Sequence, residues 1–155
     1  MIRYVLAALL AAAILSVAGL ALEDAAADNT ERELQTGISA LEDAAIDLAE
    51  NEELSPADHP DPRRTVDIRV PAGSLIETGV SHVEIEPVAG ADASFARYVL
   101  DDGTDHRELL EVRIVYRDAT DTRTTEIRGS GTQTVTLVLR PDADGDPVVV
   151  VDPPE

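Results

Sequence analysis

Polar and apolar positions follow three successive patterns along this chain. Residues 4–22 carry no charged side chain, and only Ser16 and Gly19 among them are neither aliphatic nor aromatic. Residues 23–53 repeat an apolar position every three or four residues, which is the period of an amphipathic helix. Beyond residue 64 the period falls to two, which is typical of strands. The pattern predicts an α+β fold, with a long N-terminal helix followed by a small antiparallel β-sandwich or barrel.

The first pattern predicts a transmembrane anchor over residues 1–22. Residues 4–22 would extend about 28 Å as a helix, which is close to the hydrocarbon thickness of a bilayer. The apolar region of a cleavable signal peptide is shorter, at about 7–15 residues. Small-residue cleavage sites after Ala18 or Ala27 keep a cleaved signal peptide open as the alternative.

The charges beside this span predict its orientation. Arg3 precedes the span, and Glu23 and Asp24 follow it directly. Because positively charged residues are retained on the cytoplasmic side, we expect a cytoplasmic N-terminus and a single pass through the cell membrane. All residues after position 22 would then lie outside the cell. The lipid bilayer is the first partner that the sequence predicts.

One face of the span is lined by small residues. Ala8, Ala12 and Ser16 recur every four positions, and Gly19 follows on the same face. Such stripes let helices approach closely in lipid, so these four residues are candidate helix-packing positions. An Ala-rich span with small residues on every side is the alternative interpretation.

Residues 23–53 form the second pattern, which predicts an amphipathic helical stalk. Its apolar seam consists of Leu34, Ile38, Leu41, Ala45 and Leu48, at alternating spacings of four and three. Two heptads are too few for an independent coiled coil, which needs about three or four. We therefore expect the seam to pack against the protein's own downstream domain or against a helix of a protein partner.

The third pattern begins after a Pro-rich linker at residues 54–64, where the sequence "SPADHPDPRR" cannot continue a helix. We expect an extracytoplasmic β-domain over residues 65–155, with seven short strands separated by turn sequences such as "DDGTD" and "PDADGDP". The predicted strands cover residues 64–70, 80–87, 94–101, 107–117, 122–128, 132–140 and 147–151.

The charge of the chain indicates the salt concentration in which the protein works more than it indicates the fold. The chain has 31 acidic residues and 12 basic ones, all of them Arg, for a net charge of −19. The carboxylates are spread along the chain after residue 22, which predicts a halophilic protein that folds in molar salt. The sequence has no basic patch for phosphates, so we expect no nucleic-acid partner. It has no Cys, which excludes disulfides and thiolate metal sites.

Candidate chemistry is sparse. The sequence "DADGD" gives Asp142, Asp144 and Asp146 a spacing similar to that of calcium loops. Its Gly comes too early for an EF-hand, and an acidic hairpin turn is the favoured interpretation. The three His residues have no metal-binding spacing, and the chain has no nucleophile elbow, Walker loop or dinucleotide motif. We therefore expect no catalytic residue, no cofactor and no enzymatic activity.

Several long segments nevertheless resemble a known group of proteins. The sequences "MIRYVLAALLAAAIL", "HPDPRRTVDIRVP" and "GSGTQTVTLVLRPDADGDPVVV" are similar to an uncharacterised family of haloarchaeal membrane proteins. The order of apolar helix, amphipathic helix and β-domain also resembles type IV pilin-like proteins and the membrane-anchored β-sandwich stator components of the archaeal motility filament. The resemblance implies an accessory role beside type IV pilus or type II secretion-like machinery.

The chain departs from the pilin pattern in its first residues. Pilin precursors have a basic leader that ends in Gly or Ala, and usually a Glu five residues into the apolar helix. Here only residues 1–3 precede the span, and no such Glu is present. The expectation is therefore a stationary accessory or minor pilin-like subunit rather than a filament subunit processed by a pilin peptidase.

Two functional hypotheses follow from the sequence. The first is a single-pass membrane-anchored accessory protein that presents its β-domain outside the cell and binds protein partners in a membrane assembly. The alternative is a signal-cleaved, secreted β-domain that binds a surface polymer or a small ligand.

Overall fold

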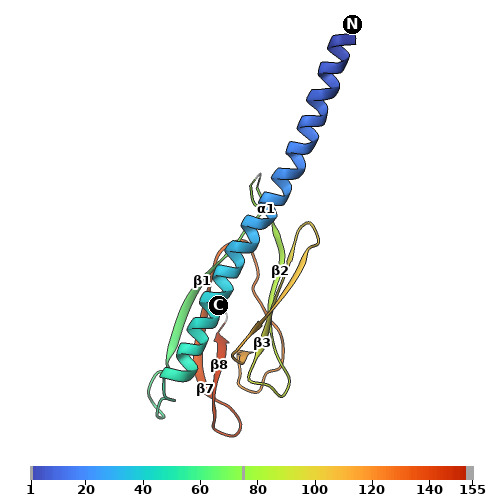
Figure 1. Ribbon diagram of the computed structural model, residues 1–155. Coiled ribbons are helices and arrows are strands. Elements are labelled where there is room, and N and C mark those ends of the chain that lie inside the picture. The colour runs from blue at the N-terminus through green and yellow to red at the C-terminus, as the bar shows by residue number, and fades with distance from the viewer. Residues whose placement is uncertain (1, 75, 153–155) are drawn as a thin grey trace.

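A computed structural model describes residues 2–74 and 76–152 of the chain. A single continuous helix, α1 (Ile2–Asn51), occupies the first third of the sequence and is about 75 Å long. Its N-terminal half projects beyond the rest of the molecule (Figure 1). The first residue of the predicted anchor, and residues 75 and 153–155 of the predicted β-domain, lie outside the described residues.

The strands form two four-stranded sheets that face each other as a small sandwich (Figure 1). Sheet A has the strand order β1-β7-β8-β5 and sheet B has the order β4-β3-β2-β6. The strands are β1 (Arg63–Val70), β2 (Val80–Pro87), β3 (Ser94–Leu100), β4 (Asp105–Leu110), β5 (Ile114–Tyr116), β6 (Thr125–Glu126), β7 (Gly131–Pro141) and β8 (Pro147–Asp152). The predicted α+β fold with a β-sandwich is confirmed.

The segment 107–117 differs from the prediction, which made it one strand. The chain crosses there from sheet B to sheet A, and β4 and β5 end up in different sheets. Side chains satisfy the backbone at the crossing: Ile114 N donates to Ser94 Oγ at 2.8 Å, and Glu111 N donates to Glu42 Oε1 at 2.6 Å. β5 lies at the far edge of sheet A and pairs with β8 in parallel, whereas the sequence predicted a wholly antiparallel domain.

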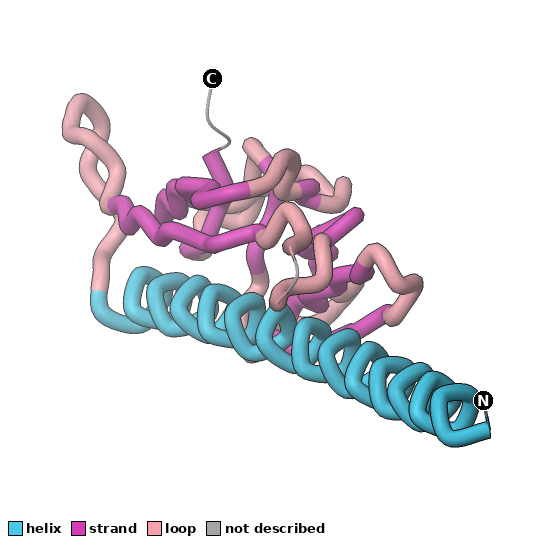
Figure 2. Tube along the Cα trace, turned by 90° about the horizontal axis from the view of Figure 1, so that it is seen from above, coloured by secondary structure: helices cyan, strands magenta, loops and turns pink. Residues whose placement is uncertain are grey.

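The second half of α1 belongs to the folded domain. It packs chiefly against β1, an edge strand of sheet A, and reaches β7 and β8 (Figure 2). Glu42 also links it to the residue after β4, the edge strand of sheet B. The helix shares one hydrophobic core with both sheets, which includes Ile68, Tyr98, Leu110 and Leu137. The segments predicted as stalk and β-domain thus share one hydrophobic core.

Polar contacts fix this half of the helix at both of its ends. Near the apolar end of the helix, Thr30 Oγ1 donates to the carbonyl of Thr78 at 2.7 Å, and Thr78 N donates to the carbonyl of Ala26 at 3.3 Å. At the other end, the Arg64 guanidinium lies between Asp47 and Glu52, at 2.7 and 2.6 Å. The β1 strand begins at Arg63, slightly earlier than the predicted linker boundary.

Gly37 lies close against Ile68 of sheet A. A Cβ atom at this position would lie 3.0 Å from Ile68 Cγ2, which is tighter than ordinary van der Waals contact. We expect Gly37→Val to lower the free energy of unfolding by roughly 1–3 kcal/mol, because overpacking costs more than the gain in helix propensity. Urea unfolding of the full chain in molar salt measures this loss.

Ser39→Val is the matched control for that variant, because it adds the same side chain to the same helix at an exposed position. We expect it to change the free energy of unfolding by less than about 0.5 kcal/mol. Equal stabilities for the two variants would contradict the close packing of α1 on β1.

Candidate functional site: the apolar helix end and the outer face of sheet B

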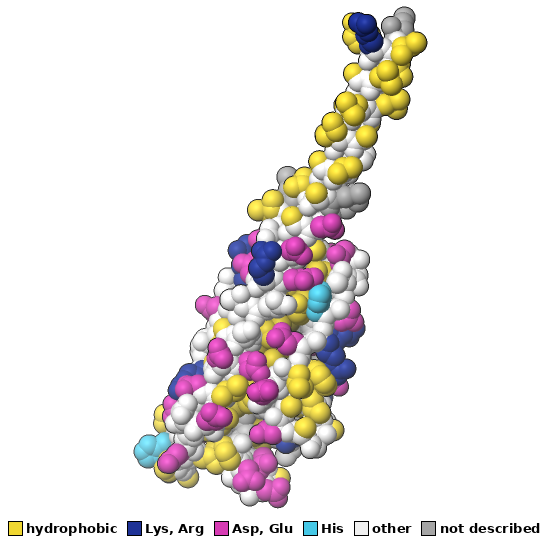
Figure 3. Space-filling view, viewed as in Figure 1, with side chains coloured by type: hydrophobic (Ala, Val, Ile, Leu, Met, Phe, Trp, Pro, Cys, Tyr) yellow, Lys and Arg dark blue, Asp and Glu magenta, His cyan; other side chains and the backbone are white. Residues whose placement is uncertain are grey.

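The N-terminal half of α1 is apolar and uncovered. This part of the helix is long and apolar enough to cross a membrane, and none of the side chains that the structure describes in this apolar segment is buried in the protein. The large side chains described there are 58–82% exposed, namely Ile2, Tyr4, Val5, Leu6, Leu9, Leu10, Ile14, Leu15, Val17 and Leu22. Figure 3 shows this yellow surface ending where the magenta acidic side chains begin. A soluble surface rarely carries an apolar patch of this extent.

The four candidate helix-packing positions all lie on this uncovered half. Ala8, Ala12 and Ser16 are exposed, and Ser16 Oγ donates to the Ala12 carbonyl within the helix at 2.8 Å. A Cβ atom added to Gly19 would meet nothing within 4 Å. No other part of the described chain covers these four positions. Their packing against a second helix stays a prediction.

The stalk seam is occupied by the protein itself. Leu34, Leu41, Ala45 and Leu48 are fully buried and Ile38 is 2% exposed, all in the core shared with the two sheets. The sequence left open whether the seam packs against the protein's own domain or against a partner's helix. The structure shows that it packs against the protein's own domain. Two further helix residues, Ala26 and Thr30, continue the buried face toward the apolar end.

The acidic turn between β7 and β8 uses its first carboxylate to hold the backbone. Asp142 Oδ1 accepts hydrogen bonds from the backbone N–H groups of Asp144 at 2.9 Å and Asp146 at 3.0 Å. Gly145 follows with a φ of 89°, as the turn requires. Within residues 2–74 and 76–152, no three His, Asp or Glu side chains gather as a group that could hold a metal ion. The hairpin interpretation accounts for the geometry of this segment.

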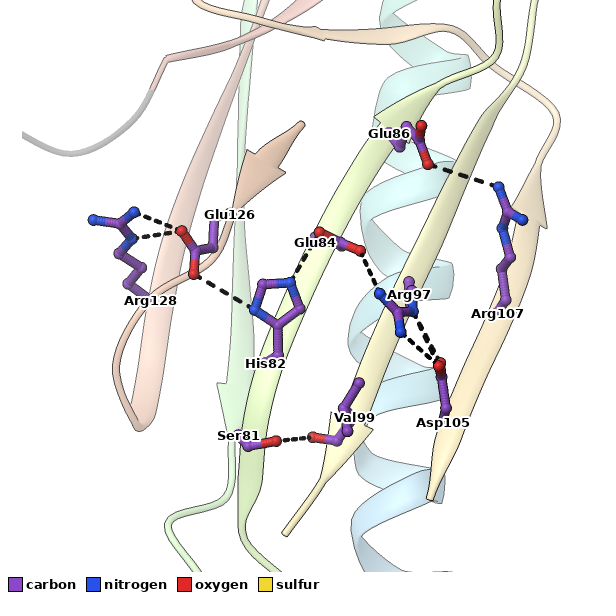
Figure 4. Close-up of polar contacts among 10 residues, drawn as sticks. All are labelled: Ser81, His82, Glu84, Glu86, Arg97, Val99, Asp105, Arg107, Glu126 and Arg128. Carbon is purple, nitrogen blue, oxygen red and sulfur yellow. Dashed lines mark hydrogen bonds and ion pairs between the residues drawn. The ribbon is translucent and has the colours of Figure 1, made fainter. Parts of the chain in front are cut away.

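The outward face of sheet B carries a ladder of alternating charge (Figure 4). The carboxylates of Glu84 and Asp105 lie on either side of Arg97, at 3.2 and 2.6 Å from its guanidinium. His82 extends the ladder toward β6: its Nε2 lies 2.9 Å from Glu84 Oε2, and its Nδ1 lies 3.5 Å from Glu126 Oε1. The ladder therefore crosses all four strands of the sheet.

These contacts shift the acidity of the carboxyl groups. The hydrogen bond with His82 and then that with Arg97 lower the pKa of Glu84, outweighing the partial burial that raises it. The hydrogen bonds from Arg97 lower the pKa of Asp105. A carboxyl group whose pKa is lowered on folding stabilises the fold above its unfolded pKa, and this contribution is lost as the pH falls through its folded pKa.

We expect Arg97→Gln to raise the pKa of Asp105 more than that of Glu84, because Glu84 retains His82. The stability difference from the wild type should be present at pH 6 and should disappear at acidic pH, where both carboxyl groups are protonated in both proteins. Carboxyl NMR titration and urea unfolding between pH 2 and 7 measure the two effects. Arg63→Gln, at an exposed strand end, is the control. If the pKa of Asp105 is unchanged in R97Q, Arg97 does not hold this carboxylate as the ladder requires.

Beside the ladder, toward the turn between β2 and β3, sheet B presents an apolar patch that the sequence interpretation missed. Phe95 is the only Phe of the chain, and it pairs across β3 and β4 with Leu109, which is 54% exposed. The Arg107 guanidinium lies 3.6 Å from the centre of the Phe95 ring. The alternation in "SFARYVL" could have revealed the patch, because Phe95 shares its face with Arg97.

A cleft of about 450 Å³ opens on the side of the sandwich where the two shortest strands, β5 and β6, lie. Three of the 12 Arg residues line it, namely Arg117, Arg123 and Arg128. The sequence interpretation did not single them out, although all three fall within residues 117–128. The cleft is a concentration of positive charge on a strongly acidic protein.

The fold and these surfaces define an α+β protein with a β-sandwich and one N-terminal helix able to span a membrane. The chain belongs to the family described as domain of unknown function DUF7311, which matches residues 1–154. Comparisons with curated proteins and with solved structures give no match.

Proposed function

We propose that this protein is a membrane-anchored, non-enzymatic accessory subunit that presents its β-sandwich outside the cell. The observation that carries the proposal is the division of α1 into two halves. The first half is apolar and uncovered, and the second is buried in the core of the domain. One helix thus joins a membrane-spanning segment to a folded domain with no flexible linker between them.

This direct connection suits a structural role. The buried face of α1 begins at Ala26, only four residues after Leu22, the last residue of the predicted anchor. Because the helix is continuous there, the domain has a fixed direction relative to the anchor. A subunit of a membrane assembly benefits from such a fixed presentation, whereas a freely diffusing binding domain does not need it.

The orientation that we propose follows from the charges beside the span. Arg3 would remain in the cytoplasm, and the acidic residues from Asp24 onward would lie outside the cell. The single pass would then place both sheets and the acidic turn after β7 on the extracytoplasmic side.

We further propose that the apolar patch of sheet B binds a protein partner. Leu109 supplies exposed apolar area beside the half-buried Phe95, and Arg107 and the charge ladder border it with polar groups. An apolar centre with a polar rim is the usual composition of a protein interface. Together with the pilin-like order of elements, this surface supports an accessory role in a type IV pilus or secretion-type assembly.

We also propose that the protein is halophilic, as the resemblance to haloarchaeal membrane proteins implies. With 31 acidic and 12 basic residues, self-repulsion destabilises the fold in dilute buffer and is screened in concentrated salt. We expect Tm to rise by at least about 10 °C between 0.1 and 3 M KCl, equivalent to roughly 3–5 kcal/mol. A Tm that falls or stays constant would contradict this proposal.

The alternative, a secreted domain released by a signal peptidase, meets a structural constraint. Cleavage after Ala27 would remove Ala26, which is 6% exposed and accepts the hydrogen bond from Thr78 N. Cleavage after Ala18 would leave the buried face intact. The earlier site therefore preserves every contact between the helix and the sheets, whereas the later site removes the first of them.

Cysteine labelling of intact cells tests the proposed topology, because the chain has no Cys of its own. We expect Asp144→Cys to react with a membrane-impermeant maleimide from outside, since it lies in the exposed turn after β7. Ile2→Cys should react only after permeabilisation. Labelling of both before permeabilisation, or of neither, would contradict the proposed orientation.

A photo-crosslinking amino acid at position 109 tests the partner surface. We expect a discrete cross-linked protein band from this position in intact membranes. The control position is Asp144, which is exposed at the distal turn and outside the patch. The same bands from both positions, or none from position 109, would count against the patch as the interface.

A further inference from the structure

The cleft between β5 and β6 has the composition of a binding site. Beside its three Arg residues it is lined by one aromatic ring and several uncharged hydrogen-bonding side chains: Tyr116, Thr124, Thr125, Gln133 and Thr134. Its volume of about 450 Å³ falls within the roughly 300–1,000 Å³ that small-molecule sites occupy. Neither the anchor nor the patch on sheet B uses these residues.

One buried group in the cleft lacks a partner. Thr125 is only 4% exposed, and its Oγ1 atom is buried without a hydrogen bond to any described residue. A buried hydroxyl without a partner costs stability, so such groups are rare in native proteins. A ligand hydroxyl in the cleft would supply the missing hydrogen bond.

The Arg side chains are held in place and retain free donors. Arg123 binds Asp121 through Nε and Nη2, and Arg128 binds Glu126 through the same two atoms. A guanidinium has five N–H donors, so the Nη1 group of each remains available. The two carboxylates therefore orient the cations without using all of their hydrogen bonds.

Arg117 is fixed by its backbone. It has a φ of 58°, which is unusual for a residue other than Gly. Its N–H donates to the carbonyl of Val151 at 3.0 Å, and its own carbonyl accepts from Arg140 Nη1 at 3.1 Å. Its guanidinium lies 5.3 Å from the centre of the Tyr116 ring, as does that of Arg123.

We propose that this cleft binds an acidic saccharide, that is, a sugar unit with a carboxylate. The guanidinium groups match the planar carboxylate, and the Thr and Gln side chains match sugar hydroxyls. The three Arg residues and the carboxylates of Asp121 and Glu126 together give the cleft a net charge of +1.

Concentrated salt makes this recognition possible on a protein of net charge −19. The Debye length in 1 M salt is about 3 Å, so the long-range repulsion between the protein and an anion disappears. Short hydrogen bonds from oriented guanidinium groups act within that distance. The site is independent of the membrane anchor, and it serves an anchored domain or a secreted one equally.

Calorimetric titration of the full-length protein in detergent and 2 M KCl tests the proposal. The probe is a galacturonic acid trisaccharide, and the matched neutral probe is a galactose trisaccharide of the same linkage. We expect the acidic trisaccharide to bind and the neutral one to bind at least tenfold more weakly. Absence of binding by the acidic probe, or equal binding of both, would overturn the proposal.

Three variants assign the binding to the cleft. Arg117→Gln should weaken the affinity at least tenfold, and Arg63→Gln, an exposed Arg outside the cleft, should leave it unchanged. Thr125→Val should weaken binding severalfold without lowering Tm, since it removes a hydroxyl that has no partner in the free protein. An affinity that is unaltered by both cleft variants would place the binding elsewhere and overturn the proposal.

Discussion

Leu41→Asp unfolds the domain. Leu41 is fully buried at the centre of the helix face that α1 contributes to the shared core. Removing a buried Leu side chain costs about 2–5 kcal/mol, and burying a carboxylate without a partner adds to this loss. We expect the free energy of unfolding to fall by about 4–5 kcal/mol, which is close to the whole stability of a domain at the lower end of the typical 5–15 kcal/mol.

Ala40→Asp is the matched control, because it introduces the same charge at the neighbouring, exposed position of the helix. Circular dichroism and urea unfolding in 2 M KCl, with the full chain in detergent, compare the two variants. If L41D and A40D melt together with the wild type, the second half of α1 does not belong to the core.

Ile14→Arg releases the protein from the membrane. Ile14 lies near the middle of the apolar half of α1 and is 59% exposed, with no part of the domain to cover it. Replacing Ile by Arg at the centre of a membrane helix changes the free energy of insertion by about 3–4 kcal/mol. Each 1.4 kcal/mol is a factor of ten, so insertion should fall more than a hundredfold.

Fractionation of cells that express the variant measures this loss. Ala40→Arg, with the same charge on the domain half of the helix, should remain in the membrane fraction as the wild type does. If I14R also remains fully membrane-bound under high-salt and carbonate washes, residues 4–22 are not the membrane-spanning segment.

The position of the core on α1 was predictable, but what covers it was not. The spacing of Leu34, Leu41 and Leu48 shows that one face of the helix is apolar, and the structure buries that face. Periodicity cannot distinguish the protein's own sheets from a partner's helix, because both would bury the same residues. The extension of the face to Thr30 was missed, since its hydroxyl is buried through a hydrogen bond to Thr78 that joins distant segments.

The strands were located well where their alternation is regular. β2 (Val80–Pro87) has the predicted bounds, and β3 (Ser94–Leu100) differs by one residue. The segment 107–117 failed because Leu109 and Leu110 are adjacent apolar residues that face opposite sides of the sheet. When residues 107–117 are interpreted as one strand, the point where the chain leaves sheet B cannot be located.

The functional surfaces were less predictable than the fold. The apolar patch and the Arg-lined cleft each join residues from separate strands, and their composition becomes visible only when those strands are placed side by side. The candidate that the sequence did offer, the acidic turn at Asp142, is explained by its backbone hydrogen bonds. A uniformly acidic chain offers many carboxylate pairs, so such spacing alone has little power to identify a site.

The central claim is that the apolar first half of α1 is retained and holds the domain at the membrane. The intact mass of the native protein, recovered separately from membrane and soluble fractions in high salt, tests this claim most directly. We predict the mass of the full 155-residue chain in the membrane fraction. A soluble product that lacks the residues up to Ala18 would contradict the account and establish the secreted alternative.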